Sequence, residues 1–407
     1  MKKLLSILCA AVLLATLVIT CVSCGGSSVS ADFKVGAILI GDENEGYTYA
    51  HINGIRTAAK ELGMSDDQII WKYTVPEDEK CYDAAIDLVE QGCAVIFSNS
   101  YGHQSHMKQA AQECPDVTFV AMTGDQAATS GLSNYKNAFT GVYQSRYVAG
   151  VVAGMKLAER VADGKLTDAN YDGDNIKLGY VGAYPYAEVV SGFTAYYLGV
   201  KSVVENVTMQ VTYTNSWFDI TAEGTVAEAL AADGCVIISQ HADSTGAPAA
   251  VQALQDKGQV IYCVGYNVDM LSVAPNAALT SPTNTWAVYY KYAMETAANG
   301  GTIDTNWAKG YEADAVGITA LGSACAAGTQ EKVDEVVKGL KDGSIKVFDT
   351  SKFTVGGATL TEYLADVDGD FAPDTNAIWD GYFHESEMRS APYFDIRIDG
   401  IVENNNN

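Results

Sequence analysis

Basic residues are scarce in this sequence of 407 residues, which holds 25 Lys and Arg against 50 Asp and Glu. The formal net charge of −25 repels phosphate groups, so it argues against nucleic acid and anionic membrane surfaces as partners. A charge of this sign suits a soluble exported domain. The length favours two or three domains once a leader is removed.

Signatures of nucleotide-dependent and hydrolytic enzymes are also missing. There is no Walker loop, no complete Gly-x-Gly-x-x-Gly sequence and no Gly-x-Ser-x-Gly elbow. His103 and His106 share one helical face without a third zinc ligand. Asp168–Gly173 and Asp366–Asp370 each match only the first part of a calcium loop. The sequence therefore predicts no metal site, no cofactor and no catalytic residues.

Long apolar runs are missing except at the N-terminus, where Lys2 and Lys3 precede an almost wholly apolar stretch from Leu4 to Thr20. A basic start followed by such a stretch predicts a signal peptide. An ordinary secreted protein or a single membrane span is the alternative interpretation. No later run is long and apolar enough to span a bilayer.

The residues after the apolar stretch resemble a bacterial lipobox. Ser23 precedes Cys24, and a Gly/Ser-rich segment follows. We expect residues 1–23 to be a lipoprotein signal peptide, Cys24 to be lipidated, and residues 24–32 to be a linker. The protein would then be anchored by lipid at the extracytoplasmic face of the cell membrane.

Six cysteines follow this segment, and several of them sit inside apolar runs that read as strands. This position favours buried free thiols over a disulfide framework or a metal site. They are Cys81, Cys93, Cys114, Cys235, Cys263 and Cys325.

The most informative feature is an internal repeat. "KVGAILIG" from Lys34 is echoed by "KLGYVGAY" from Lys177, and Gly54 has its counterpart in Gly192. "DLVEQGCAVIFSNSYGHQS" is echoed in the same way by "EALAADGCVIISQHADSTG". The offset between the copies stays nearly constant, which indicates two copies of one fold.

Each copy reads as alternating strands and helices. The strands are short continuous apolar runs, such as "AVIFS" and "CVIIS", as expected for strands covered on both faces. Alternation of this kind predicts an α/β fold with a doubly wound parallel sheet and right-handed crossovers. The chain is therefore expected to form two similar lobes with a ligand cleft between them.

Aromatic and polar residues follow the predicted strands in both copies. Tyr47, Tyr101 and Trp217 follow strands at the equivalent edges of the two copies, and ligands of open α/β sheets bind at the carboxyl ends of strands. Aromatic faces beside a few acceptors suit a flat, hydrogen-bonding heterocycle. The alternative is that these rings only cover the hydrophobic core.

Several ordered stretches carry a family resemblance. "EGYTYAHINGIRTA", "YQSRYVAGVVAGMKLA", "NSWFD", "ISQHADST" and "VGYNVDMLSVAPNAALTSPTNTW" resemble the basic membrane lipoproteins, which are substrate-binding proteins of bacterial ABC importers. The branch most similar to this sequence binds purine bases and nucleosides. The resemblance implies a type I periplasmic-binding-protein-like fold that closes by hinge motion around its ligand, a monomer, and an ABC permease as partner.

Domain boundaries follow from the repeat and the resemblance. We expect lobe I to comprise residues 33–143 and about 281–325, and lobe II to comprise residues 144–280 and about 326–348. Residues 349–407 would be a C-terminal extension whose end, "IVENNNN", is expected to be disordered. The resemblance also implies three segments that cross between the lobes.

The resemblance implies a set of ligand-binding residues. Tyr47 stands where the family has a tryptophan, and Asn44 stands where the family usually has Asp. Trp217 matches a position that lines the second lobe's face, and Asp243 and Asp269 match polar positions that face the cleft. The predicted set is Asn44, Tyr47, Tyr101, Trp217, Asp243, Asn267, Asp269 and Trp286.

The identity of the ligand leaves alternatives. The nucleoside-binding branch has a lysine after a late strand, but Leu279–Tyr290 has none and carries Trp286 instead. A shortened pocket would leave ribose hydroxyls unpaired, so adenine or a close relative is expected to bind at least roughly tenfold tighter than its nucleoside. A sugar or a flavin is the alternative ligand. An exported nucleoside hydrolase using Asp243 and Asp269 is the alternative function.

Overall fold

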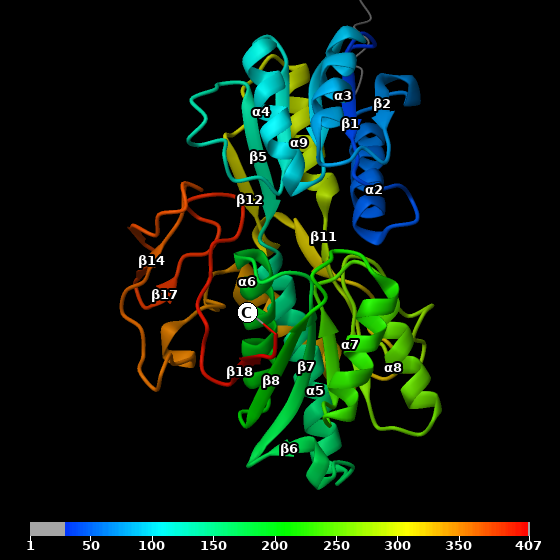
Figure 1. The fold of residues 1–407 in the computed structure, drawn as a ribbon, viewed down its shortest axis with the longest axis vertical. Coiled ribbons are helices and arrows are strands. Elements are labelled where there is room, and N and C mark those ends of the chain that lie inside the picture. Colours follow the sequence, from blue (N-terminus) through cyan, green and yellow to red (C-terminus); the bar gives the residue numbers. More distant parts are fainter. Residues whose placement is uncertain (1–28, 406–407) are drawn as a thin grey trace, which may run out of the picture.

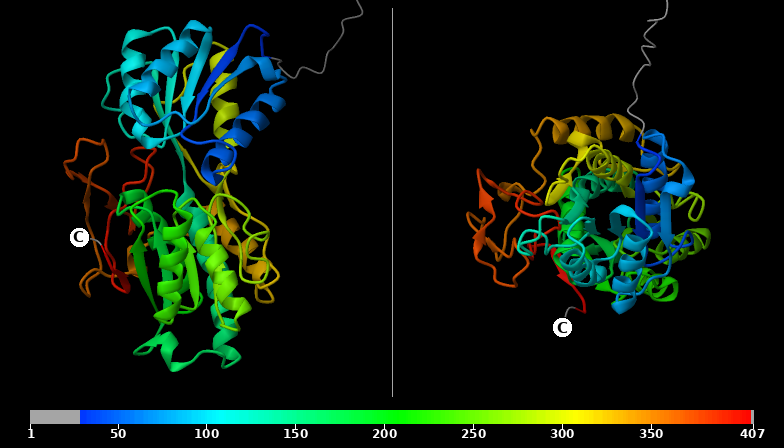
Figure 2. Two further views of the ribbon diagram at one scale, coloured as in Figure 1. Left: turned by 45° about the vertical axis from the view of Figure 1, so that its right-hand side comes forward. Right: turned by 90° about the horizontal axis from the view of Figure 1, so that it is seen from above.

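The computed structural model describes residues 29–405, so the predicted signal peptide and Cys24 lie outside the described residues. Two α/β lobes are stacked along the long axis of the molecule, and the C-terminal extension lies against one side (Figures 1 and 2). Each lobe is built on a six-stranded sheet. The description of an α/β fold with two parallel-sheet lobes is confirmed.

Lobe I has the strand order β12-β5-β4-β3-β1-β2, and every neighbouring pair is parallel. Its helix α9 comes from a later part of the chain and packs on α2 in the same hydrophobic cluster. The elements are β1 (Lys34–Ile38), α2 (Gly46–Glu61), β2 (Ile69–Lys72), α3 (Glu79–Glu90), β3 (Cys93–Ser98), α4 (Gln104–Glu113), β4 (Thr118–Met122), β5 (Tyr135–Thr140), α9 (Trp286–Ala298) and β12 (Asn306–Lys309).

Lobe II has the strand order β10-β9-β7-β8-β18, with β6 antiparallel to β7. The elements are α5 (Val142–Ala162), β6 (Tyr171–Asp172), β7 (Asn175–Gly182), α6 (Ala187–Lys201), β8 (Val207–Tyr213), α7 (Ile220–Ala232), β9 (Ile237–Gln240), α8 (Gly246–Asp256), β10 (Tyr262–Val264) and α10 (Thr329–Lys341). Helices α5 and α6 touch through glycines, since a Cβ on Gly150 would lie 2.1 Å from the carbonyl oxygen of Tyr196.

The chain passes between the lobes three times. The first passage leads from β5 to α5 at Gly141, and the second leads from β10 to α9 through β11 (Pro282–Asn284). The third leads from β12 to α10 through β13 (Val316–Ile318). Strands β11 and β13 pair with each other antiparallel, so the second and third crossings are hydrogen-bonded to each other.

The C-terminal extension packs on lobe II. Its hydrophobic residues, including Phe353, Phe383 and Phe394, join the hydrophobic cluster of that lobe. Two small antiparallel pairs form within it, β14 (Leu364–Ala365) with β15 (Thr375–Asn376) and β16 (Ile378–Trp379) with β17 (Tyr382–Phe383).

The end of the chain differs from the expectation of disorder. Ile401–Glu403 forms β18, which pairs parallel with β8 and completes the lobe II sheet. The reason is that β8 would otherwise expose an open edge of unpaired backbone groups, which a further strand satisfies. Asn405 also donates to the carbonyl oxygen of Tyr213 at 2.9 Å, so order continues past the strand.

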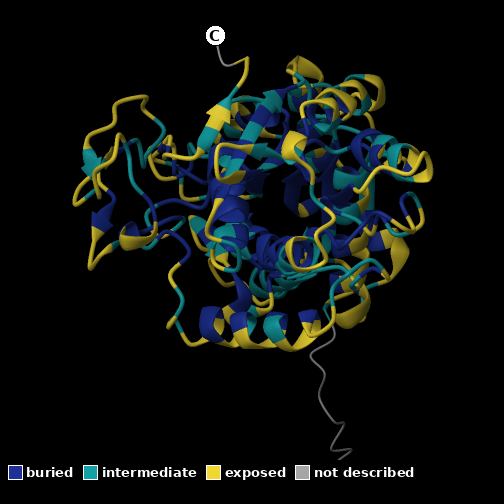
Figure 3. Ribbon diagram, turned by 90° about the horizontal axis from the view of Figure 1, so that it is seen from below, coloured by how far each residue is buried: buried dark blue, intermediate teal, exposed yellow. Residues whose placement is uncertain are grey.

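Burial follows the layers. The strands at the centre are buried, whereas the outer helix faces and loops are exposed (Figure 3). The six cysteines within residues 29–405 are unpaired thiols. Within the same residues, no helix combines the length and the apolar character needed to cross a bilayer.

Candidate ligand-binding site

A cavity of about 280 Å³ lies between the two lobes, just below the range of roughly 300–1,000 Å³ typical of ligand pockets. It is lined from both sides at the carboxyl ends of the strands, where open α/β sheets bind ligands. The lining residues are Ile40, Gly41, Glu45, Tyr47, Glu77, Asn99, Ser100, Tyr101, Thr123, Glu188, Trp217, Phe218, Asp243 and Tyr266.

Tyr47 is held on the lobe I side by the start of α2. The carboxylate of Glu45 caps this helix, because its oxygens accept from the backbone N–H groups of Tyr47 at 3.2 Å and Thr48 at 3.1 Å. The Tyr47 hydroxyl donates to the carbonyl oxygen of Asn99, and its ring meets His51 edge-on at 4.6 Å. The ring is therefore fixed before any ligand arrives, and burial holds the Tyr47 pKa well above its usual value.

Tyr101 lies at the mouth of the cavity and is 43% exposed. Its hydroxyl donates to Oδ2 of Asp125 at 3.0 Å. Nearby, Oε1 of Glu77 accepts from the Ser100 hydroxyl at 2.5 Å and from the Gly102 N–H at 2.9 Å. The carboxylate of Glu77 therefore already has hydrogen-bonding partners in the loop after β3, whereas the exposed ring of Tyr101 can contact a ligand.

Trp217 forms the aromatic wall on the lobe II side. Its ring packs edge-on against Tyr184 at 5.4 Å, and Tyr184 in turn stacks on Tyr186 at 5.0 Å. The Trp217 carbonyl accepts from the Asp243 N–H at 2.7 Å, which ties the wall to the neighbouring loop. Two aromatic faces, Tyr47 and Trp217, therefore border one cavity from opposite lobes.

Asp243 presents a carboxyl group to the same cavity. Its Oδ1 accepts from the Asn267 side chain at 2.7 Å. Asn267 in turn accepts from Asn284 at 3.2 Å, and the Thr140 hydroxyl donates to Asn284 at 2.5 Å. Burial, with Glu45 nearby, raises the pKa of Asp243 well above its usual range. This polar chain runs from the cavity through the segments that join the lobes.

Glu188 also lines the cavity, and the sequence analysis did not select it. It belongs to the first turn of α6, and its Oε1 lies 3.3 Å from Nε2 of His241. Burial raises the Glu188 pKa to about 7, although Arg146 opposes the shift. The internal repeat could have identified Glu188, because Glu188 follows the first strand of the second copy and Glu45 follows the first strand of the first copy.

Arg146 and His241 form a buried layer beneath Glu188. Arg146 donates to the Gln240 carbonyl at 2.5 Å and stacks over the Tyr266 ring at 3.7 Å. Burial lowers the His241 pKa well below its usual value, and Arg146 adds to this effect. His241 is therefore neutral, and Arg146 is the one fixed cation of this layer.

Four predicted residues line the cavity: Tyr47, Tyr101, Trp217 and Asp243. Asn267 stands behind the wall as the partner of Asp243. Asn44 is exposed and bonds to Asp42 instead. Asp269 is exposed, and its Oδ1 accepts from the Leu271 N–H at 2.7 Å.

Trp286 lies in the core of lobe I, where it is 1% exposed. Its ring stacks on His51 at 4.4 Å, and a Cβ on Gly54 would lie 2.8 Å from its own Cβ. The structure thus places Trp286 behind Tyr47, outside the lining of the cavity. A tryptophan at the start of a helix serves here to pack α9 on α2.

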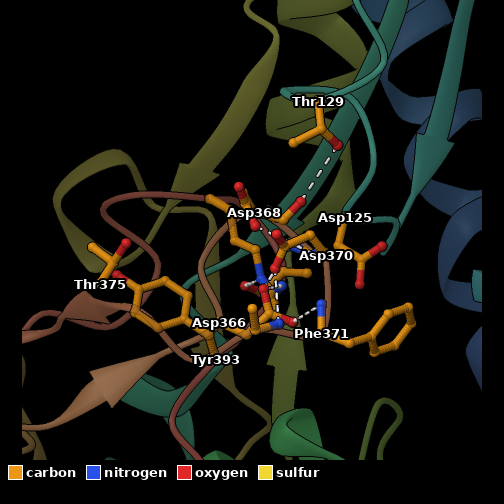
Figure 4. Close-up of polar contacts among 12 residues, drawn as sticks. Asp125, Thr129, Asp366, Asp368, Asp370, Phe371, Thr375 and Tyr393 are labelled. Atoms are coloured by element: carbon orange, nitrogen blue, oxygen red, sulfur yellow. Dashed lines mark hydrogen bonds and ion pairs between the residues drawn. The ribbon is translucent and has the colours of Figure 1, made fainter.

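A separate acidic cluster lies in the C-terminal extension (Figure 4). Carboxylate oxygens of Asp366, Asp368 and Asp370 lie within 4.8 Å of one another. Asp366 accepts from the N–H groups of Gly369 at 2.8 Å and Phe371 at 3.1 Å. These local bonds account for a tight loop in which Phe371 adopts a φ of 68°.

Comparisons with known proteins bear on this site. The Bmp model, described as "ABC transporter substrate-binding protein PnrA-like", matches residues 40–350. A purine-binding protein of Brucella abortus is 32% identical over 267 residues, covering 65% of this chain and 69% of the relative. A putative ABC transporter glucose-binding protein of Haloferax volcanii is 28% identical over 277 residues, covering 68% and 64%.

A solved structure supports the fold. The ABC transporter solute-binding protein of Conexibacter woesei superposes with a TM-score of 0.59 at 18% identity, covering 77% of this chain and 98% of that chain. At that level of identity the likeness concerns the fold alone. The match to the family model extends over both lobes and most of the chain, so this protein belongs to the Bmp family of PnrA-like ABC transporter substrate-binding proteins.

Proposed function

We propose that this protein is a lipid-anchored extracytoplasmic receptor that captures a purine base or nucleoside between its lobes and delivers it to an ABC permease. The observation that carries the proposal is one small cavity with Tyr47 and Trp217 on opposite lobes and carboxyl groups beside them. A flat heterocycle stacks on aromatic faces, and its N–H groups need acceptors.

The relatives support the same ligand class. The Brucella relative is called a purine-binding protein. Separately, the match to the family model over residues 40–350 includes the stretches that contribute the cavity residues. Trp286 does not line the cavity, so its indole does not shorten the pocket on the side where a ribose would project. The proposal therefore covers both the free base and its nucleoside.

Titration calorimetry of ligand-stripped protein tests the ligand class. The panel is adenine, adenosine, guanine, guanosine, glucose, ribose and riboflavin. Binding of at least one purine, with no response to the sugars or riboflavin, is the expected result. Binding of glucose alone would show that the ligand is a sugar and not a purine. A sugar is the second candidate because the Haloferax relative is named a putative glucose-binding protein.

A hydrolase is the less favoured function. Of the two carboxylates considered for catalysis, Asp243 lines the cavity and Asp269 does not. Chromatography of adenosine and guanosine after long incubation with the protein is expected to return both intact. Release of the free base at a rate proportional to protein concentration would contradict a purely binding role.

The lipid anchor is tested in cells. Feeding a clickable palmitate analogue is expected to label the wild-type protein through Cys24. The matched variant Cys24→Ala is expected to lose the label, whereas Cys21→Ala keeps it. Equal labelling of Cys24→Ala and wild type would place the modification elsewhere.

A further inference from the structure

We propose that Glu188, with Asp243 beside it, reads the hydrogen-bonding edge of the purine and that it takes adenine-type edges with its carboxyl group protonated. This inference rests on the proposed function and names the residue that would choose among purines. Among the described residues that line the cavity, four carry carboxyl groups and none is Lys, Arg or His: Glu45, Glu77, Glu188 and Asp243.

Two of these four groups are already engaged by the protein. Glu45 caps α2 with both of its carboxylate oxygens. Glu77 accepts from Ser100 and Gly102. The carboxyl groups of Glu188 and Asp243 each have only one hydrogen-bonding partner, at 3.3 Å and 2.7 Å. A carboxyl group has room for more partners than that, so these two have capacity left for a ligand.

Both groups come from lobe II and stand next to the aromatic wall. The Asp243 N–H donates to the Trp217 carbonyl oxygen, and the Trp217 ring lies 6.4 Å from the ring of His241, the partner of Glu188. A purine stacked on Trp217 would therefore present its polar edge to this pair.

The aromatic and histidine neighbours of Glu188 stay neutral near pH 7, whereas two other carboxyl groups of the cavity, Asp243 and Glu45, also have pKa values raised by burial. Burial raises the pKa of Tyr47, Tyr180 and Tyr266, which face Glu188 from α2, β7 and the loop after β10, so all three stay neutral. His241 stays neutral because burial lowers its pKa. The guanidinium of Arg146, from α5, acts on Glu188 in the direction opposite to burial and lowers its pKa.

The protonation state of a carboxyl group decides which purine edge it fits. A protonated carboxyl group offers one donor and one acceptor, which matches the adenine amino group beside a ring nitrogen. An ionised carboxylate offers acceptors only and matches the two adjacent N–H donors of guanine. With the Glu188 pKa near 7, neutral solution holds both forms, and adenine binding above that pH takes up a proton from solvent.

Calorimetric titrations of adenine and guanine at about pH 5.5 and about pH 8.5 test the proposal. Adenine is expected to bind about 30-fold more weakly at the higher pH, because the protonated fraction falls by that factor around a pKa near 7. Guanine is expected to change in the opposite direction by a similar factor. Adenine titrations near pH 8 in two buffers of different ionisation enthalpy should show uptake of close to one proton.

The variant Glu188→Gln carries a donor and an acceptor at every pH. It is expected to bind adenine with the same affinity at both pH values and to bind guanine weakly at both. Glu61→Gln is the matched control, since Glu61 is exposed and pairs with Lys291 outside the cavity. It should keep the wild-type pH dependence.

The outcomes separate this inference from the proposed function. Purine binding that is independent of pH in the wild type, or an unchanged pH dependence in Glu188→Gln, would overturn the role of Glu188 and leave the purine receptor intact. A pH dependence lost in Asp243→Asn but kept in Glu188→Gln would move the role to Asp243 and also overturn it. No purine binding at either pH would overturn the proposed function itself.

Discussion

The two lobes share one topology but differ in the side chains that occupy equivalent buried positions. The four strands of each repeat lie in the same spatial order, β4-β3-β1-β2 in lobe I and β10-β9-β7-β8 in lobe II. In both copies a glycine of the helix after the first strand admits a close neighbour. That neighbour is Trp286 at Gly54 in lobe I and His241 at Gly192 in lobe II.

The difference lies in the chemistry of these neighbours. In lobe I, Trp286 stacks on the buried ring of His51 and belongs to the core. In lobe II, His241 contacts Glu188, and Arg146 lies beside it with no acidic partner within bonding distance among the described ion pairs. In lobe I the neighbour of this glycine is therefore a packing residue of the core, whereas in lobe II it belongs to a group of buried polar residues behind the cavity. Stability and ligand selection are expected to respond to different lobes.

Two tryptophans give the strongest contrast. Trp286→Ala is expected to lower the free energy of unfolding by about 3–5 kcal/mol, because it empties a fully buried site. Trp217→Ala removes a cavity wall that is only partly buried, so it is expected to weaken purine binding by about 1–3 kcal/mol, which is about 5- to 150-fold. Denaturant unfolding and calorimetry measure the two effects.

The opposite results for the two tryptophan variants would contradict this division between stability and binding. If Trp217→Ala unfolded the protein at much lower denaturant, its ring would be a core element of lobe II. If the affinity of Trp217→Ala equalled that of the wild type, the aromatic wall would not touch the ligand. Trp286→Ala should bind normally under conditions where it is folded.

The paired glycines sharpen the comparison. An added Cβ would lie 2.8 Å from Cβ of Trp286 in Gly54→Ala and 2.6 Å from Nδ1 of His241 in Gly192→Ala. Overpacking of this kind costs about 1–3 kcal/mol, so both variants are expected to have lower melting temperatures. Only Gly192→Ala is expected to weaken ligand binding, because it displaces the partner of Glu188. Equal affinity in the two variants would contradict a ligand role for that layer.

Acid sensitivity tests the buried histidine of lobe I. Burial lowers the His51 pKa from 6.5 to about 3. Below pH 6.5 the unfolded chain therefore binds a proton at this histidine, whereas the folded protein does not. The contribution of His51 to the free energy of unfolding is complete above pH 6.5 and is lost as the pH falls. This site should contribute about 1.4 kcal/mol per pH unit, or about 2 kcal/mol between pH 6.5 and 5.

Denaturant unfolding of His51→Gln over that pH range measures the contribution. The variant is expected to be less stable than the wild type at pH 6.5, where it loses the stack on Trp286, but to lose less stability on acidification. His103 and His241, whose pKa values are also lowered by burial, remain as the background slope. An unchanged slope in the variant would mean that His51 takes up its proton in the folded protein as readily as in the unfolded chain.

The sequence predicted the architecture well for a physical reason. The repeat and the continuous apolar runs are local signals, and they sufficed for two parallel-sheet lobes. Tyr47, Tyr101, Trp217 and Asp243 were predicted to meet at one cleft because strand ends of a parallel sheet converge at one edge, and all four line the cavity. A local sequence pattern does not determine whether a side chain faces the core or the cavity in the tertiary structure.

Trp286, Glu188 and β18 illustrate that limit. A tryptophan at a helix start reads equally as a pocket wall or as a packing residue, and its neighbour Gly54 is far away in the sequence. Glu188 sits at a helix N-terminus, where a carboxylate is expected for local electrostatic reasons alone. The last strand pairs with β8 across most of the second half of the chain, and a polar tail gives no sign of that partner.

The smallest effect is expected at the rim of lobe I. Tyr101 is half-exposed, and its hydroxyl bonds to Asp125 rather than to a group inside the cavity. Tyr101→Phe keeps the ring and removes a single hydrogen bond, whose net contribution is about 0.5–1.5 kcal/mol when formed in a folded protein and less where water competes. Purine affinity is therefore expected to change by less than about threefold, since about 0.7 kcal/mol corresponds to that factor. Tyr101→Ala, which also removes the ring, is the matched comparison and should lose more. A tenfold loss in Tyr101→Phe would show that the hydroxyl itself contacts the ligand, and polar recognition would then be shared by both lobes instead of residing in lobe II.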